Sequence, residues 1–202
     1  MIRLHTHPFS TYARRVHIAL IEKSIPFEMI AVDMAARQHR APEYLALNPY
    51  GRVPTLEEDG MILYESAAIL QYLEATHPDP ALTPADAKGR ALVDMHLRLC
   101  DLQMGRPAGT IIFPKRFLPK ERWEEKAIAG AQAEIAKHLG ILETHLVGHD
   151  YLVADRYTLA DIAYIPFLEF LPLMVDAVLA HVADWRERLL ARPSSMQTKP
   201  AH

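Results

Sequence analysis

The chain has 202 residues, half of them hydrophobic, and a formal net charge of -3 at pH 7. This length suits one large domain or two small ones and is enough to bury a hydrophobic core. The near-neutral charge provides neither a basic field for nucleic acid nor an acidic solvating tail, so we expect a small-molecule or protein partner.

The composition also bears on compartment and membrane association. The opening residues lack the apolar region of a signal peptide, which predicts a cytoplasmic protein. The single cysteine, Cys100, excludes an internal disulfide and fits a reducing compartment. It stands in an apolar helical pattern, where a buried thiol is more common than a nucleophile. Residues 164–182 form the longest apolar region, but prolines and acidic residues interrupt it, so we expect no membrane span.

The first 32 residues have the order strand, helix, strand. Apolar and polar residues alternate at positions 2–5, which predicts a short strand. The apolar residues of 12–23 recur at helical spacing, and Ser10 and Thr11 precede them as candidate N-caps. Residues 27–32 read as the second strand. This order predicts a βαβ unit.

The most specific local signals lie between residues 48 and 74. Val53-Pro54 places a proline directly before a short predicted strand, which is an unusual position. One hypothesis is a cis bond between these residues, because a cis proline usually marks a fixed, tight geometry. Asp59-Gly60 then separates two apolar runs, which strongly predicts a hairpin of two antiparallel strands. A βαβ unit followed by ββα is the order of a thioredoxin-like sheet.

Glu65 and Ser66 stand where the hairpin ends and a helix begins. The unpaired N–H groups of a helix start favour a bound carboxylate or phosphate, and Glu65 can accept an ammonium. Together they can hold both ends of an α-amino acid group. A serine at a helix start is more often only a cap. The neighbouring strand that follows Val53-Pro54 is what favours a ligand site here.

This stretch resembles the cytosolic glutathione transferase family. The matching residues are Asn48-Pro49, Gly51, Val53-Pro54, Leu56, Asp59-Gly60, Glu65-Ser66, Ala68-Ile69 and Tyr72-Leu73. The resemblance implies an α/β thioredoxin-like N-terminal domain and an all-α C-terminal domain. It also implies that the backbone of Val53, before a cis Pro54, pairs with the cysteinyl part of glutathione. Glu65 and Ser66 would take the γ-glutamyl group.

We place the first domain at residues 1–76 and a linker at 77–86, where prolines exclude helix. Residues 87–202 form the all-helical domain, which the resemblance implies contributes the acceptor-substrate site. Two long helices are predicted by the apolar series Leu92, Met95, Leu99 and Leu102, and by Ile128, Ala131, Ile135, Leu139, Leu142 and Leu146. Thr158 and Asp161 have the spacing of a capping box, and we assign them a structural role.

The segment 7–16 opens the first helix and resembles the phi and theta classes, with Ser10 at the position of their catalytic serine. Alone, Ser10 would read as an N-cap. Thr11 and Tyr12 stay open as alternative hydroxyls. The zeta class matches less well, because Tyr12 and Arg14 replace its cysteine and tryptophan. Neither tyrosine nor cysteine ends the first strand, which disfavours the classes that depend on them.

Three basic residues are candidates for the glycyl end of glutathione: His39, Arg40 and Arg52. The resemblance implies this role for the pair His39-Arg40, although a solvated basic loop explains it equally well. Apolar side chains would contact the acceptor, and the candidates are Phe9, Met104, Ile111, Ile112 and Phe113. Core packing explains these residues equally well.

The resemblance therefore implies a homodimeric enzyme that transfers the thiolate of its co-substrate glutathione to a small apolar electrophile, with Ser10 lowering the thiol pKa. One alternative is a non-catalytic interaction module of the same fold. Another is a glutathione-dependent isomerase, dehalogenase or peroxide reductase. The joint presence of Ser10, Val53-Pro54 and Glu65-Ser66 favours an enzyme, because a scaffold needs only the proline and the hydrophobic pattern. The scattered histidines lack the spacing of a metal site, so we expect no metal.

Overall fold

The computed structural model describes residues 1–200. The chain divides into two compact units, Met1–Leu82 with residues 193–200, and Thr83–Arg192. The division between the units thus falls inside the linker expected at 77–86. The C-terminal end differs from the expectation, because residues 193–200 pack with the first unit and not with the helical one.

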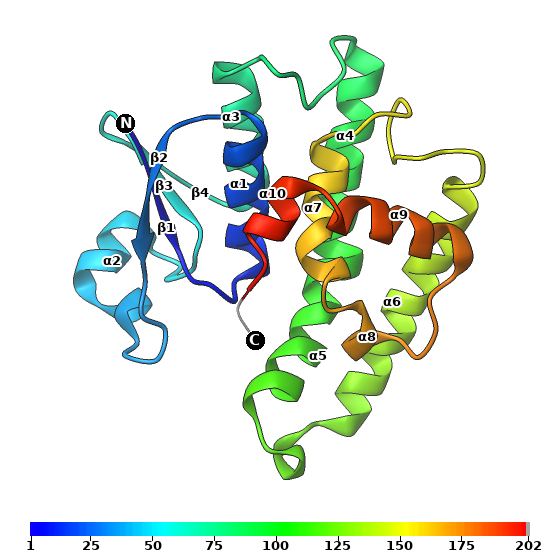
Figure 1. Ribbon diagram of the computed structural model, residues 1–202. Coiled ribbons are helices and arrows are strands. Elements are labelled where there is room, and N and C mark those ends of the chain that lie inside the picture. The colour runs from blue at the N-terminus through cyan, green and yellow to red at the C-terminus, as the bar shows by residue number, and fades with distance from the viewer. Residues whose placement is uncertain (201–202) are drawn as a thin grey trace. The chain divides into compact units, whose positions relative to one another are not determined.

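The first unit is a four-stranded mixed sheet with helices on both faces (Figure 1). The strand order is β2-β1-β3-β4, with β1 and β2 parallel and the other pairs antiparallel. The strands are β1 (Ile2–Thr6), β2 (Phe27–Ala31), β3 (Thr55–Glu58) and β4 (Met61–Tyr64). The helices are α1 (Thr11–Glu22), η1 (Gln38–Arg40), α2 (Pro42–Leu47), α3 (Ser66–Thr76) and α10 (Pro193–Gln197).

Figure 1 shows α1 and α3 on one side of this sheet and α2 on the other. The inward side chains of the strands and of α1 and α3 form one hydrophobic cluster, because strand residues alternate between faces and helix residues repeat every three to four positions. Its members are Ile2, Leu4, Val16, Leu20, Ile25, Leu56, Ile69 and Leu73. The predicted thioredoxin-like domain is confirmed.

The chain leaving α3 is fixed by a buried lysine. The side chain of Lys23 is 0% exposed, and its Nζ donates to the carbonyls of His77 at 2.7 Å and Pro80 at 2.9 Å. It also forms an ion pair with Glu74, whose Oε1 accepts from the backbone N–H of Leu82 at 3.0 Å. One ammonium group therefore holds three points on the segment that ends the first unit.

The second unit is entirely helical over its described elements, as predicted. These are α4 (Ala87–Leu99), the π-helix η2 (Cys100–Gly105), α5 (Arg106–Phe117), η3 (Lys120–Arg122), α6 (Glu125–His145), α7 (Leu159–Leu168), α8 (Leu171–Met174) and α9 (Ala180–Leu190). All the apolar residues predicted to line α6 and its end are buried. The capping box is also confirmed, because Thr158 and Asp161 cap α7 reciprocally. The buried Asp161 further accepts from the indole of Trp185 at 3.0 Å.

The predicted apolar face of α4 was wrong. Leu92, Met95 and Leu102 are 37%, 44% and 56% exposed. The buried face lies one residue further along and consists of Val93, His96, Leu97 and Cys100. It was missed because a histidine interrupts its apolar pattern. In addition, the π-helix that follows adds residues per turn, so Leu102 does not continue the period of the preceding helix.

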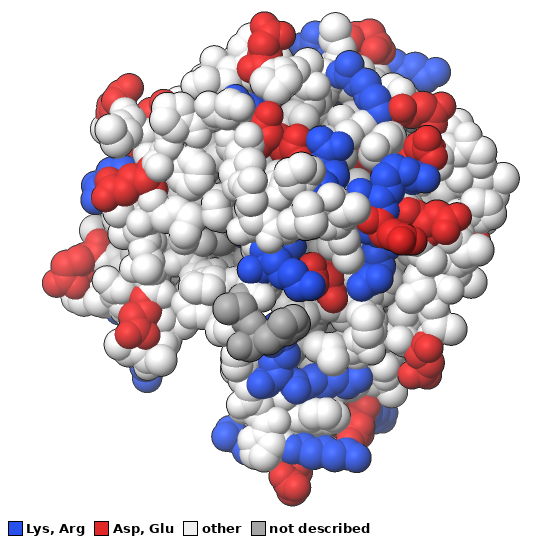
Figure 2. All heavy atoms as spheres, in the orientation of Figure 1, with Lys and Arg blue, Asp and Glu red and all other residues white. Residues whose placement is uncertain are grey.

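Three general expectations concern the molecule as a whole. Among residues 1–200, no helix is both long enough and apolar enough to cross a bilayer. On the face drawn in Figure 2, Lys and Arg lie among Asp and Glu, as the small net charge suggests. Within the described chain, no three His, Cys, Asp or Glu side chains gather closely enough to hold a metal ion.

Cys100 is a buried thiol that donates to the carbonyl of Ala163 at 3.3 Å.

Candidate functional site

Three segments of the first unit meet at one edge of the sheet. In the strand register, His5 lies opposite Thr55, and Thr55 lies opposite Tyr64. Because these residues form one row across the sheet, the chain that follows β1, precedes β3 and follows β4 emerges at the same edge. The start of α1, the Val53-Pro54 turn and the start of α3 are therefore brought together.

Ser10 is the N-cap of α1. Its backbone is extended, with φ -79° and ψ 111°, and its Oγ accepts a hydrogen bond from the N–H of Ala13 at 3.1 Å. A hydroxyl has one proton to donate besides its acceptor lone pairs, so capping does not use the O–H of Ser10. Thr11 is the first residue of the helix, and the Tyr12 ring lies 4.6 Å from the guanidinium of Arg15. Ser10 thus combines the cap position with an O–H that the cap leaves to donate.

The turn before β3 presents its backbone to the same edge. The bond between Val53 and Pro54 is cis, as predicted. The carbonyl of Arg52 accepts from the Tyr44 hydroxyl at 2.7 Å and from Asn48 Nδ2 at 2.9 Å, which fixes the turn. Within residues 1–200, the main chain of Val53 has no hydrogen-bond partner. It is therefore placed to pair with an extended peptide.

Glu65 and Ser66 form the junction between β4 and α3. Glu65 has φ 71° and ψ 104°, a left-handed conformation that is rare for a residue with a side chain. Such a conformation costs on the order of 1–3 kcal/mol and is typical of ligand sites. Ser66 is buried and begins α3, whose first N–H groups have no partner within the helix. The junction can therefore bind a carboxylate.

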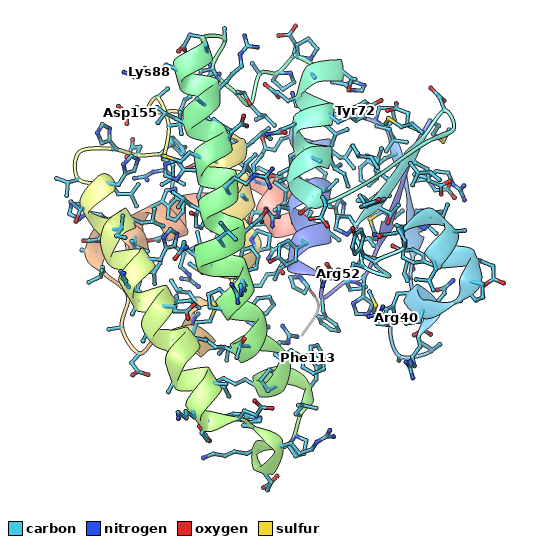
Figure 3. The ribbon with its side chains drawn as sticks, turned by 180° about the vertical axis from the view of Figure 1, so that it is seen from behind. Arg40, Arg52, Tyr72, Lys88, Phe113 and Asp155 are labelled. Carbon is cyan, nitrogen blue, oxygen red and sulfur yellow. The ribbon has the colours of Figure 1, made fainter. Side chains whose placement is uncertain are left out.

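Gly51 brings η1 against the turn that carries Val53. Its φ is +59°, and a Cβ there would lie 2.7 Å from the carbonyl oxygen of His39 and 3.1 Å from Arg40 Nη1. Only glycine permits this approach. Burial, and then the charges of neighbouring arginines, lower the pKa of the His39 imidazole. Figure 3 shows Arg40 and Arg52 at one end of the first unit and Tyr72 at the other.

The structure corrects part of the predicted acceptor site. Met104 and Ile111 are 0% exposed and belong to the core of the second unit, so neither can contact a substrate without repacking. Phe113 is 58% exposed. Ile112 in the second unit and Phe9 in the first are partly exposed.

Sequence reasoning did not find the residues that support the Val53 turn. Tyr44 contributes its hydroxyl from α2, and Asn48 is 2% exposed with hydrogen bonds to both ends of the turn. Asn48 stood in a recognised turn motif, but its side-chain partners lie several residues further along the chain. Tyr44 has no sequence signal for the hydrogen bond that its hydroxyl donates to the carbonyl of Arg52.

Comparisons with known proteins agree with this geometry. The family model described as the N-terminal domain of glutathione S-transferase matches residues 4–81, and the C-terminal domain model matches residues 108–193. A glutathione S-transferase of Silene vulgaris is 36% identical, over 98% of this chain and 96% of its own. Glutathione S-transferase PARB of Nicotiana tabacum is 32% identical, over 99% and 94%.

Solved structures show the same likeness. Glutathione transferase F2 of Populus trichocarpa superposes with a TM-score of 0.90 at 26% identity, covering 98% of this chain and 97% of its own. A glutathione S-transferase-I bound to lactoylglutathione gives a TM-score of 0.86 at 26% identity, covering 98% of both chains. Two family models together match more than half of the chain, and relatives more than 30% identical span nearly all of it. The chain therefore belongs to the glutathione S-transferase family of transferases.

Proposed function

We propose that the protein binds glutathione at the edge of the sheet described above and transfers its thiolate to a small apolar electrophile. The observation that carries this proposal is the Ser10 hydroxyl, which caps α1 and keeps its proton to donate. A relative solved with lactoylglutathione supports the choice of peptide. A cytoplasmic role in detoxification is consistent with such a transfer.

Each part of the tripeptide has a candidate partner. The main chain of Val53 is proposed to pair with the cysteinyl residue in the manner of an added strand. The N–H groups at the start of α3, with Ser66, would donate to the γ-glutamyl carboxylate, while Glu65 accepts from the γ-glutamyl ammonium. His39, Arg40 and Arg52 are basic groups near the same edge and would face the glycyl carboxylate.

The energy required of Ser10 is modest. Lowering a thiol pKa from about 8.5 by about two units needs roughly 2.7 kcal/mol of preference for the thiolate. A hydroxyl donating to a charged acceptor contributes about 1.5–3 kcal/mol, and a helix N-terminus adds roughly 0.3–1 kcal/mol. One hydrogen bond from Ser10 and the N-terminus of α1 can therefore together supply the required preference.

The test is the titration of enzyme-bound glutathione, followed by thiolate absorbance at saturating protein. We expect the bound thiol to have a pKa about two units below that of the free peptide, and Ser10→Ala to remove most of this shift. Glutathione affinity should change little, because the γ-glutamyl anchor is elsewhere. Thr11→Ala and Tyr12→Phe are the controls, and a loss of the shift in either would name a different hydroxyl. A parent thiol that titrates like free glutathione would favour the interaction module.

The anchor can be tested separately by calorimetry. Glu65→Ala and Ser66→Ala should each weaken glutathione binding by about 1–3 kcal/mol, because each removes a charge-assisted contact. Glu58→Ala removes a partly buried carboxylate at the other end of β3, where it accepts from the Tyr72 hydroxyl at 2.7 Å. This control should bind like the parent. Parent-like affinity in both site variants would refute the assignment of the γ-glutamyl site.

We further propose a symmetric homodimer. Both units expose large apolar side chains that a second copy would cover: Tyr50, Met61 and Ile62 in the first unit, and Leu92, Met95 and Leu102 in the second. Sedimentation at micromolar concentration should show a species of twice the chain mass. The double variant Met95→Asp with Leu102→Asp should shift it toward the monomer, because charges are costly in a covered apolar face. A parent that sediments only as a monomer would contradict the proposal.

A further inference from the structure

The short helix α10 is hydrogen-bonded to both the first and the last turn of α1. After the second unit the chain returns to the first, and α10 packs along α1 (Figure 1). In the last turn of α1, Glu22 Oε1 accepts from Ser194 Oγ. In the first turn, Arg14 donates from Nη2 to the carbonyl of Ser195 at 3.1 Å and from Nε to Thr198 Oγ1 at 3.3 Å.

Arg14 connects this attachment to the candidate catalytic hydroxyl. The side chain of Arg14 contacts α10, whereas its main-chain N–H donates to the carbonyl of Ser10 at 3.0 Å. That bond closes the first turn of α1, the same turn in which the N–H of Ala13 donates to Ser10 Oγ. The orientation of the hydroxyl therefore depends on the conformation of a turn that Arg14 holds from outside.

The first turn of a helix needs such support. Its leading N–H groups have no intrahelical partner, and helix ends fray more easily than interiors. A group that stabilises a developing or bound charge must be held within about 0.5 Å of its working position. Arg14 is 5% exposed, and a guanidinium withdrawn from water is held firmly by its hydrogen-bond partners.

We propose that Arg14, bound to Ser195 of α10 and to Thr198 just after it, is a positioning residue that holds the Ser10 hydroxyl toward the glutathione thiolate. This inference rests on the proposed function of Ser10. It assigns the C-terminal segment a part in thiol activation, although that segment follows the whole helical unit in the chain. The contact between Ser194 and Glu22 serves as an internal comparison, because it joins the same two helices at the end of α1 far from Ser10.

The experiment compares three variants of the full chain: Arg14→Met, Thr198→Val and Ser194→Ala. The readouts are the pKa of the bound glutathione thiol, kcat and KM for conjugation, and hydrogen exchange at the Ala13 amide. Arg14→Met and Thr198→Val should each raise the bound thiol pKa by about one unit and leave the KM for glutathione nearly unchanged. When kcat is measured at a pH below the thiol pKa, it should fall by up to about tenfold. Exchange at Ala13 should accelerate in both. Ser194→Ala should show neither effect, even if it is less stable.

Each outcome decides the matter. A parent that does not lower the thiol pKa refutes the proposed function and the positioning role with it. A parent that lowers it, with a shift that Ser10→Ala removes but Arg14→Met and Thr198→Val retain, overturns the positioning role alone. An equal effect in Ser194→Ala would also overturn it, since general loosening of α10 would then explain the change. If Arg14→Met fails to fold, the nearly isosteric Thr198→Val decides.

Discussion

Acidification from pH 7 to pH 4 should destabilise the protein by several kcal/mol, because two buried histidines resist protonation. His96 is 3% exposed and His138 is 4% exposed. The pKa of each is lowered from 6.5 to about 4, by burial in His138 and by burial together with the neighbouring His145 and His138 in His96. Each histidine accounts for at most about 3 kcal/mol.

The sign follows from proton binding. Well above pH 6.5 both imidazoles are neutral in the folded and the unfolded chain, so they contribute no pH dependence there. Between about pH 6.5 and about pH 4 the unfolded chain binds protons that the folded chain does not. The free energy of unfolding therefore falls as the pH is lowered through this window.

His96→Leu provides the sharpest test. Both ring nitrogens of His96 are buried without a hydrogen-bond partner among the described residues, so an apolar side chain leaves no polar group unpaired. The variant should be as stable as the parent at pH 7 or more so, and should lose less stability on acidification. His149→Gln changes a half-exposed histidine and is the matched control. Denaturant titrations at several pH values from 7 to 4 measure the free energy of unfolding. If it falls equally with pH in the parent and in His96→Leu, the prediction is contradicted.

Lys23→Met should lower the free energy of unfolding by about 3–5 kcal/mol, the usual cost of removing one partner from a buried ion pair. The substitution leaves the Glu74 carboxylate without its cation and the carbonyls of His77 and Pro80 without their donor. Urea unfolding at constant pH measures the loss. Lys88→Met, on the exposed side of α4 (Figure 3), should change stability by no more than about 0.5 kcal/mol.

A double-mutant cycle isolates the ion pair from the carbonyl contacts. If Lys23→Met combined with Glu74→Gln is less destabilising than the sum of the single changes, the charges interact directly. An additive result would assign the loss to the two carbonyls. A Lys23→Met protein as stable as the Lys88→Met control would show that the buried lysine does not hold the segment.

The elements most predictable from sequence are those determined by neighbouring residues. Asp59-Gly60 suits only a tight hairpin, and Thr158 with Asp161 specifies a helix start through side chains three residues apart. Ser10 was predictable as a cap for the same reason. The juxtaposition of Ser10, Val53 and Glu65 at one sheet edge required the resemblance to a family, because strand register links positions far apart in the chain.

What the sequence did not reveal depends on distant partners. The buried face of α4 includes His96, whose polarity disguised the apolar period. Lys23 resembles any surface lysine, since its acceptors are mainly backbone carbonyls more than fifty residues away. Residues 193–200 follow a helical unit without interruption, and their contacts with Arg14 and Glu22 in the structure show that they pack elsewhere.

The return of α10 to the first unit has a consequence for the order of synthesis. When the ribosome has added Leu82, all residues of the sheet and of α1, α2 and α3 have been synthesised, but the residues that bind Arg14 have not. The whole of Thr83–Arg192 must be translated first, which takes on the order of 10 s at about 5–20 residues per second. During that interval the nascent first unit carries a basic side chain that lacks its C-terminal acceptors. The first unit is thus begun first but receives its last helix only after the second unit has been made.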